Sequence, residues 1–163
     1  SNILESSSLS SPTIDVGEHM ALEKIYKIKV EENKIITDDH FIINGNKAYA
    51  GQHIIIDFWY TNFDNKINTL RKIIKKAVML SNATLINLKL HRFGEEQGIS
   101  GVAVLAESHI SVHTWPERDY IAFDIFMCGN TNPQIATKYL ISSLNPREKF
   151  IKTIKRWEHK LDK

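Results

Sequence analysis

Apolar and polar residues alternate along much of this chain, and a period of two predicts β-strands. The alternating segments are also rich in β-branched and aromatic residues, which fit a pleated and partly buried surface. Six segments are predicted to be strands, namely residues 52–60, 84–91, 102–106, 110–115, 120–126 and 150–157, and the first of them is continuously apolar in its middle. Residues 25–30 alternate as well and are a candidate edge strand or arm. Gly45-Asn46 is predicted to form a turn.

Two further segments repeat apolar residues every three to four positions, which predicts helices with one apolar face. The first is capped by Asn62 or Asp64 and ends at about Leu80. The second begins at Asn132-Pro133, because proline fits the first turn of a helix, and it ends at Leu144. The predicted buried side chains are Ile67, Leu70, Ile73, Ile74, Ala77 and Val78 in the first helix and Ile135, Ala136, Tyr139, Leu140 and Leu144 in the second.

The order of elements is strand, helix, four strands, helix, strand. This order predicts an α+β two-layer sandwich, with an antiparallel β-sheet and two amphipathic helices on one face. Residues 1–16 are rich in serine and lack periodicity. We therefore expect residues 1–40 to be a flexible N-terminal extension or arm and residues 41–163 to be one domain.

The composition is that of a soluble globular protein, with 42% hydrophobic and 25% charged residues. A net charge of +2 is too small to indicate nucleic-acid binding. No apolar run approaches the roughly 20 residues that span a bilayer, and no secretory signal is visible. The single cysteine leaves no internal disulfide and fits a reducing compartment. A cytoplasmic location without membrane contact is expected.

Reactive side chains gather between Gly98 and Gly129, within and directly beside three predicted strands. A hydroxyl, an imidazole and a thiol on neighbouring strands can meet in one site, and Ser108, His113 and Cys128 supply them. Each also has a structural interpretation, as a backbone-bonded serine, a bonded histidine and a buried apolar cysteine. His109 and His113 have the spacing of a helical metal-ligand pair, but they lie in strand sequence, so no metal is expected.

Five short motifs make the interpretation specific. They occur in this order: His91-Arg92-Phe93, Gly98-Ile99-Ser100-Gly101, Glu107-Ser108-His109, His113-Thr114-Trp115-Pro116-Glu117 and Cys128-Gly129. In these motifs residues 51–129 resemble the bacterial and archaeal form of S-adenosylmethionine decarboxylase, with weaker support towards the C-terminus. The resemblance implies that residues 41–163 form a domain of this kind, with an antiparallel sheet backed by helices. It also implies a homodimer with active sites at or near the interface.

The same resemblance implies a cofactor made from the chain. The Ser108 hydroxyl attacks the carbonyl of Glu107, the chain is cut between these two residues, and Ser108 becomes a pyruvoyl group that forms a Schiff base with the substrate. His113 is implied as the base that removes the serine α-proton. Ser100, predicted to lie in a tight turn over 98–101, assists by hydrogen bonding, and Cys128 donates a proton to the product.

Two further residues are implied in substrate binding. Phe93 matches the family position that stacks on the adenine, although core packing is an equal alternative. Glu117 matches the position that hydrogen-bonds the ribose hydroxyls, although an exposed turn glutamate explains it as well. Glu107 and His109 are given no part in decarboxylation, and His109 is expected to be structural.

The leading hypothesis is a zymogen that cleaves itself and then decarboxylates S-adenosylmethionine, supplying aminopropyl groups for spermidine synthesis. An alternative substrate is a basic amino acid, ornithine or arginine. The acidic residues Glu95 and Glu96, close to Phe93, favour this alternative because they attract cations. A third hypothesis is a non-cleaving homologue that binds nucleosides.

Overall fold

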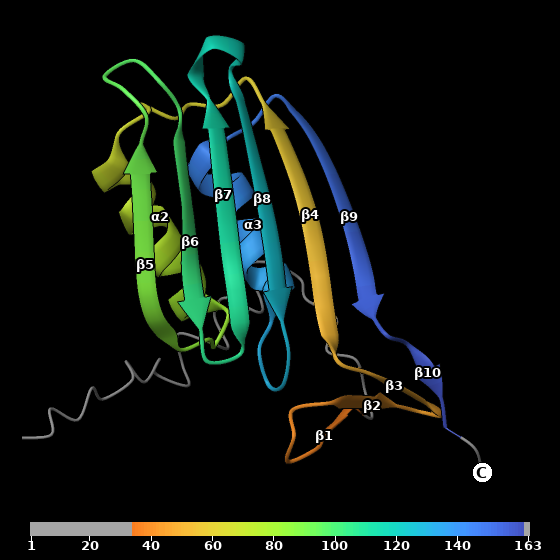
Figure 1. The fold of residues 1–163 in the computed structure, drawn as a ribbon. Coiled ribbons are helices and arrows are strands. Elements are labelled where there is room, and N and C mark those ends of the chain that lie inside the picture. Colours follow the sequence, from red (N-terminus) through yellow and green to blue (C-terminus); the bar gives the residue numbers. More distant parts are fainter. Residues whose placement is uncertain (1–33, 162–163) are drawn as a thin grey trace, which may run out of the picture.

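The computed structural model of this protein describes residues 34–161. The predicted strand 25–30 and most of the predicted extension 1–40 lie outside the described residues. Within them, the chain forms a six-stranded sheet, a smaller four-stranded sheet and two helices (Figure 1).

The large sheet is antiparallel throughout, with the strand order β5-β6-β7-β8-β4-β9. Its strands are β4 (Gly51–Trp59), β5 (Leu85–Arg92), β6 (Ile99–Leu105), β7 (Ser108–Trp115), β8 (Tyr120–Met127) and β9 (Glu148–Arg156). Every one of the six predicted strands is present, and the bounds differ by a few residues. The central strands β7 and β8 alternate buried and less buried residues, as a sheet with one covered face requires.

Two helices, α2 (Ile67–Leu80) and α3 (Pro133–Leu144), cover one face of this sheet (Figure 1). The predicted α+β sandwich with both helices on one face is therefore confirmed. Neither helix is long and apolar enough to cross a membrane, a finding that holds for residues 34–161. The core between helices and sheet is aliphatic and aromatic, and its fully buried large side chains include Ile54, Ile56, Phe58, Leu70, Ile74, Ile99, Ile110, Phe123, Ile125 and Met127.

Side-chain hydrogen bonds at the N-termini of the two helices help to determine where each helix begins. At α3 the Asn132 side chain accepts a hydrogen bond from the Ile135 N–H at 3.2 Å, so the predicted cap is confirmed. At α2 the residue before the helix is Lys66, which makes no side-chain cap. Asp64 instead accepts from the Lys66 N–H and the Thr69 hydroxyl, at 3.1 and 3.0 Å. The predicted cap at Asn62 or Asp64 is therefore two or more residues early.

The predicted tight turn over residues 98–101 is wrong, because β6 already begins at Ile99. Gly101 pairs with Leu90 on β5, and the two strands come very close there. A Cβ on Gly101 would lie 2.2 Å from Leu90 Cδ2 and 2.6 Å from the Lys89 carbonyl oxygen. The glycine is required by close packing between strands and not by a turn.

A second sheet joins the two ends of the described chain. It has the order β1-β2-β3-β10, formed by β1 (Lys34–Ile36), β2 (Ile42–Asn44), β3 (Lys47–Tyr49) and β10 (His159–Lys160). The predicted turn at Gly45-Asn46 is confirmed between β2 and β3, where Gly45 has a φ of 61°. The four strands were not predicted, because two or three residues are too few to display a period.

Candidate active site

The face of the large sheet opposite the helices, here called the open face, carries most of the polar side chains of the central strands. No element among residues 34–161 packs across it in the way that α2 and α3 cover the other face (Figure 1). Strand alternation brings residues from four strands onto this face, and they include Ser100, Val102, Val104, His109, Ser111, His113, Tyr120, Asp124, Phe126, His53 and Asp57.

Ser108 lies at one end of the open face in a strained backbone conformation. It follows the two-residue turn between β6 and β7, pairs with Leu105 and Met127, and has a φ of 138°. Non-glycine residues rarely adopt this conformation, which costs of order 1–3 kcal/mol and is found mainly at functional sites. The strain therefore marks the Glu107–Ser108 peptide bond as a position with a special role.

The carbonyl oxygen of Glu107 is held by two donors from Cys128. The Cys128 backbone N–H and its Sγ each lie 3.1 Å from this oxygen. Two donors that converge on one carbonyl stabilise negative charge that develops there during nucleophilic attack. Partial burial raises the pKa of the Cys128 thiol, and the neighbouring Glu107 charge raises it further, so the thiol is protonated at neutral pH.

Two contacts that the sequence did not reveal hold the segments around Ser108 and Cys128 in place. The Glu107 carboxylate accepts a hydrogen bond from the Thr84 N–H at 2.8 Å. The Gly129 N–H donates to the His40 carbonyl at 3.0 Å, which ties the Cys128 turn to the segment before β2. Both partners act through backbone atoms, so no side-chain motif could have indicated them.

Ser100 and His113 form a second group, on the neighbouring strands β6 and β7. They are directly opposite each other, and Ser100 Oγ lies 2.8 Å from His113 Nδ1. The structure therefore brings together His113, implied as the base for the α-proton, and Ser100, implied to assist processing by hydrogen bonding. The hydrogen bond fixes the orientation of the imidazole ring.

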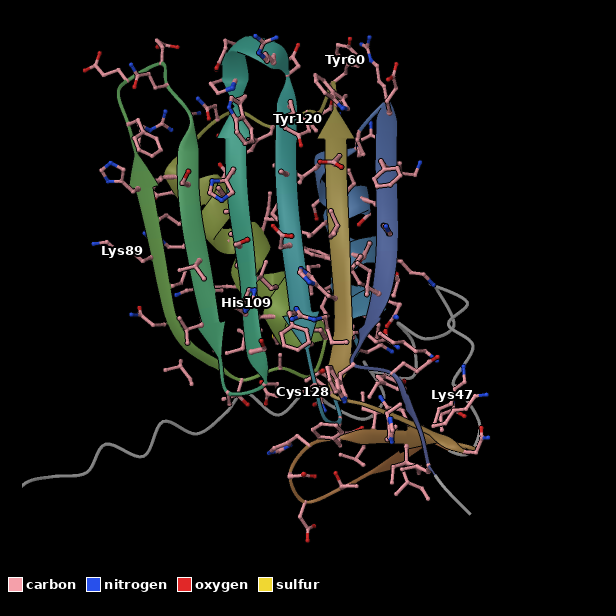
Figure 2. The ribbon with its side chains drawn as sticks, turned by 45° about the vertical axis from the view of Figure 1, so that its right-hand side comes forward. Lys47, Tyr60, Lys89, His109, Tyr120 and Cys128 are labelled. Carbon is pink, nitrogen blue, oxygen red and sulfur yellow. The ribbon has the colours of Figure 1, made fainter. Side chains whose placement is uncertain are left out.

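The two groups do not meet within one chain. Ser108 and His113 are five residues apart on the same extended strand, which separates them by about 17 Å. Figure 2 shows His109 and Cys128 towards one end of the sheet and Tyr120 at the other. Phe93 and Glu117 belong to the far end: Phe93 follows β5 and is 62% exposed, and Glu117 lies exposed in the 3-10 turn Pro116–Arg118 after β7.

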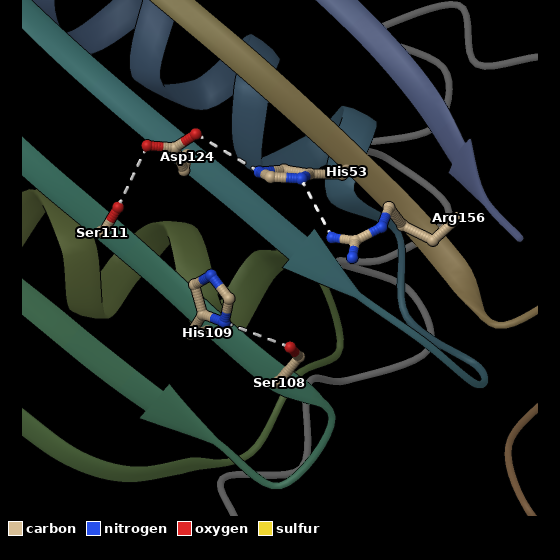
Figure 3. A network of polar contacts seen from close by, with 6 residues as sticks. All are labelled: His53, Ser108, His109, Ser111, Asp124 and Arg156. Atoms are coloured by element: carbon tan, nitrogen blue, oxygen red, sulfur yellow. Dashed lines mark hydrogen bonds and ion pairs between the residues drawn. The ribbon is translucent and has the colours of Figure 1, made fainter.

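A polar network crosses the open face beside Ser108 (Figure 3). His53 Nε2 lies 3.3 Å from the Asp124 carboxylate, which also accepts from the Ser111 hydroxyl at 3.2 Å. Arg156 lies 3.5 Å from His53 Nδ1. No sequence motif indicated this network, although alternation in β4 and β8 places His53 and Asp124 on the same face. Among residues 34–161, no three His, Cys, Asp or Glu side chains gather as a metal site requires.

Comparisons with known proteins agree with this geometry. The sequence model of the family described as S-adenosylmethionine decarboxylase matches residues 52–157. The S-adenosylmethionine decarboxylase proenzyme of Methanococcus aeolicus is 43% identical over 112 residues, covering 66% of this chain and 94% of that protein. The proenzyme of the same name from Thermomicrobium roseum is 36% identical over 107 residues, covering 65% and 92%.

A solved structure is similar as well. The crystal structure of the adenosylmethionine decarboxylase from Aquifex aeolicus superimposes with a TM-score of 0.60 at 33% identity, and covers 66% of this chain and 91% of that one. The family match spans all of the large sheet except the first residue of β4, together with both helices, the Glu107–Ser108 bond, Cys128 and the Ser100–His113 pair. The chain therefore belongs to the S-adenosylmethionine decarboxylase family and is a decarboxylase, that is, a carboxy-lyase.

Proposed function

We propose that this chain cuts its own peptide bond between Glu107 and Ser108, and that the cleaved protein decarboxylates S-adenosylmethionine. The observation that carries the proposal is the Glu107 carbonyl, which accepts from both Cys128 donors at 3.1 Å beside a strained serine. These residues fit the formation of a pyruvoyl group from Ser108, because nucleophile, electrophilic carbonyl and charge-stabilising donors are adjacent.

In the first step Ser108 Oγ attacks the Glu107 carbonyl carbon, and the amide becomes an ester. The carbon–nitrogen bond breaks, and the freed nitrogen takes the proton that the hydroxyl loses. A base then removes the Ser108 α-proton, the bond between Ser108 Cβ and Oγ breaks, and the main-chain carboxylate of Glu107 leaves as the new C-terminus of the first fragment. His113 is our candidate for this base, oriented by Ser100 at 2.8 Å. Hydrolysis of the remaining dehydroalanine end releases ammonia and leaves the ketone.

The pyruvoyl group, once formed, supplies a ketone that acts as an electron sink for decarboxylation. Cys128 keeps its proton at neutral pH because burial and the Glu107 charge raise its pKa, so it can deliver that proton to the product α-carbon. Phe93 offers an exposed aromatic face for the adenine. Glu117 offers a carboxylate that can accept hydrogen bonds from two ribose hydroxyls.

We further propose that two copies pair through their open faces and share each active site. A base must lie within hydrogen-bond reach of the proton that it removes, and His113 is about 17 Å along the strand from Ser108 of its own chain. In the proposed pair, a two-fold axis relates the copies and their open faces lie against each other. The strands of the two copies run in opposite directions, so His113 of one copy lies over Ser108 of the other. Exposed apolar side chains on this face, such as Val102, Val104 and Trp115, favour the pairing because it would remove them from water.

An intact-mass spectrum of the denatured protein tests the cleavage. Self-cleavage of the 163-residue chain gives a 107-residue fragment ending at Glu107 and a 56-residue fragment with a pyruvoyl end. Ser108→Ala should give one uncleaved species. Persistent full-length wild-type protein after long incubation contradicts the proposal and favours the non-cleaving, nucleoside-binding alternative.

Mixing two inactive variants tests the shared site. Ser108→Ala lacks the nucleophile and His113→Ala lacks the base, so neither should cleave alone. Co-expressed, they form mixed pairs in which Ser108 of one chain faces His113 of the other. The His113→Ala chain should then be cleaved, and its mass identifies it. Absence of cleavage in mixed pairs that are shown to form rules out a site shared in this way.

Carbon dioxide release identifies the substrate. The cleaved protein should act on S-adenosylmethionine and leave ornithine and arginine unchanged. The two amino acids are included because the acidic residues Glu95 and Glu96 favour a cationic substrate. We propose that in the cell the decarboxylated product supplies aminopropyl groups for spermidine synthesis. We place the enzyme in the cytoplasm, where a reducing environment keeps the Cys128 thiol free.

A further inference from the structure

The His109 imidazole lies against the hydroxyl that self-cleavage must activate. Its Nδ1 is 3.2 Å from Ser108 Oγ (Figure 3). This distance allows the hydroxyl to donate a hydrogen bond to an unprotonated Nδ1. His113 cannot serve the same hydroxyl within its chain, and its Nδ1 is already engaged by Ser100 at 2.8 Å.

The surroundings of His109 keep the ring neutral. Partial burial, with the Phe126 ring 6.0 Å away, is the main cause that lowers its pKa below the usual value. His53 on β4, whose ring is 6.5 Å away, lowers the pKa further, and Arg156 on β9 adds a smaller effect. Asp124 on β8 opposes them. A neutral imidazole has a free lone pair, which a base requires.

We propose that His109 is the base that accepts the Ser108 hydroxyl proton in the first step of self-cleavage. This role rests on the self-cleavage proposed above. The proton moves from Ser108 Oγ to His109 Nδ1 as Oγ bonds to the Glu107 carbonyl carbon. When the carbon–nitrogen bond breaks, the imidazolium gives the proton to the departing Ser108 nitrogen. Atoms and charge balance without any further reactant.

This assignment divides the proton transfers between two histidines. His109 acts on the hydroxyl proton and leads to the ester, whereas His113 of the second copy acts on the α-proton and leads to chain cleavage. The two steps can therefore be blocked separately. His109 is adjacent to Ser108 in sequence, and neighbours on a regular strand point to opposite faces, but Ser108 departs from regular strand geometry with a φ of 138° and its hydroxyl lies 3.2 Å from His109 Nδ1.

Hydroxylamine cleavage provides the test, because it cuts an ester bond but leaves the amide intact. In full-length His113→Ala protein the ester should accumulate, and hydroxylamine should release a 107-residue hydroxamate fragment and a 56-residue fragment beginning with intact Ser108. Adding His109→Ala to this variant should slow ester formation by about 100-fold or more, the usual contribution of a general base. Adding His159→Ala, which changes an exposed histidine on β10, should leave the rate unchanged.

A third variant separates a base from a group that merely positions the serine. His109→Asn retains an acceptor but cannot take up a proton, so His113→Ala/His109→Asn should also form the ester slowly. With His109 present, ester formation should be constant at neutral pH and fall only below about pH 6.5, since the His109 pKa is lowered from its usual value. The slow variants should lose this pH dependence. Thermal unfolding of each variant verifies that it folds.

The outcomes distinguish this inference from the proposed function. Rapid ester formation in His113→Ala/His109→Ala or in the asparagine variant overturns the role of His109 alone. If His113→Ala forms no ester and the wild-type chain does not cleave, both proposals fail. A folded double variant that forms the ester slowly, without the pH dependence seen when His109 is present, supports His109 as the base.

Discussion

The two faces of the large sheet are made by the same strands but serve different purposes. On β8, Phe123 is 1% exposed beneath the helices, whereas its neighbour Asp124 holds a carboxylate that is 40% exposed on the open face. The covered face is almost wholly apolar and supplies the burial that stabilises the fold. The open face carries His109, His113 and a polar network, and it holds the groups that we propose for self-cleavage.

The candidate site therefore lies on strands that are stabilised by the packing of the covered face against the helices. Catalytic side chains can therefore be polar and partly exposed without weakening the core. Within the open face, one extended strand keeps Ser108 and His113 about 17 Å apart, which is the reason for proposing a site shared between two copies. Variants that affect one face and spare the other can test the division.

The largest effect is expected from removing an aromatic ring on the covered face. Phe123→Ala should lower the free energy of unfolding by about 3–5 kcal/mol, because it removes a fully buried ring from a packed core. Phe126→Ala makes the same change three residues later on the open face, where the ring is only partly buried, and should cost clearly less. Denaturant unfolding of both variants measures the difference, and equal losses would contradict the division between the faces.

A smaller effect is expected at the turn that holds Cys128. Gly129→Ala places a side chain at a φ of 61°, and its Cβ would lie 3.0 Å from His40 Nδ1. The strain alone costs about 1–2 kcal/mol, and displacement of His40 should shift Cys128 and slow self-cleavage. Intact-mass time courses and unfolding experiments measure the two effects.

Gly45→Ala is the matched control for this variant. Gly45 also has a φ of 61°, but a Cβ there meets no atom within 4 Å. It should lose a similar amount of stability from strain and cleave at the wild-type rate. Slow cleavage in both variants would indicate that general destabilisation, and not the Cys128 turn, limits the reaction.

The smallest effect concerns a partly buried hydroxyl on the open face. The Tyr120 hydroxyl donates to the Asp57 carboxylate, and burial together with this carboxylate raises the pKa of Tyr120 to about 12. Because the folded pKa exceeds the unfolded value of about 10, this contribution to stability is complete below pH 10 and is lost as the pH rises towards 12.

Ultraviolet titration of tyrosinate measures this shift, with Tyr120→Phe identifying the signal among the five tyrosines. Asp57→Asn should lower the pKa, since it removes the negative charge that favours the protonated phenol and leaves only a weaker, neutral acceptor. An unchanged titration in Asp57→Asn would mean that burial alone determines the pKa, and that Asp57 contributes little to this end of the open face.

From the sequence alone, the six strands of the large sheet, both helices and the antiparallel sandwich could be predicted, but not the order of the strands. Periodicity carries this information directly, because side chains repeat every two residues in strands and every 3.6 in helices. The sequence also provided the family motifs, and with them Ser108, Cys128 and the Ser100–His113 pair. It misjudged residues 98–101, where two glycines resemble a turn but Gly101 allows close strand packing against Leu90.

Tertiary structure alone decided how these residues meet. The contact from Cys128 to the Glu107 carbonyl spans 21 residues, and the tie from Gly129 to His40 is made by backbone atoms. Hydrogen bonds of this kind depend on the register of paired strands, which no local pattern specifies. The His109 contact with Ser108 is local and accompanies the unusual backbone conformation at Ser108, whereas the extended form of β7 keeps His113 away from Ser108.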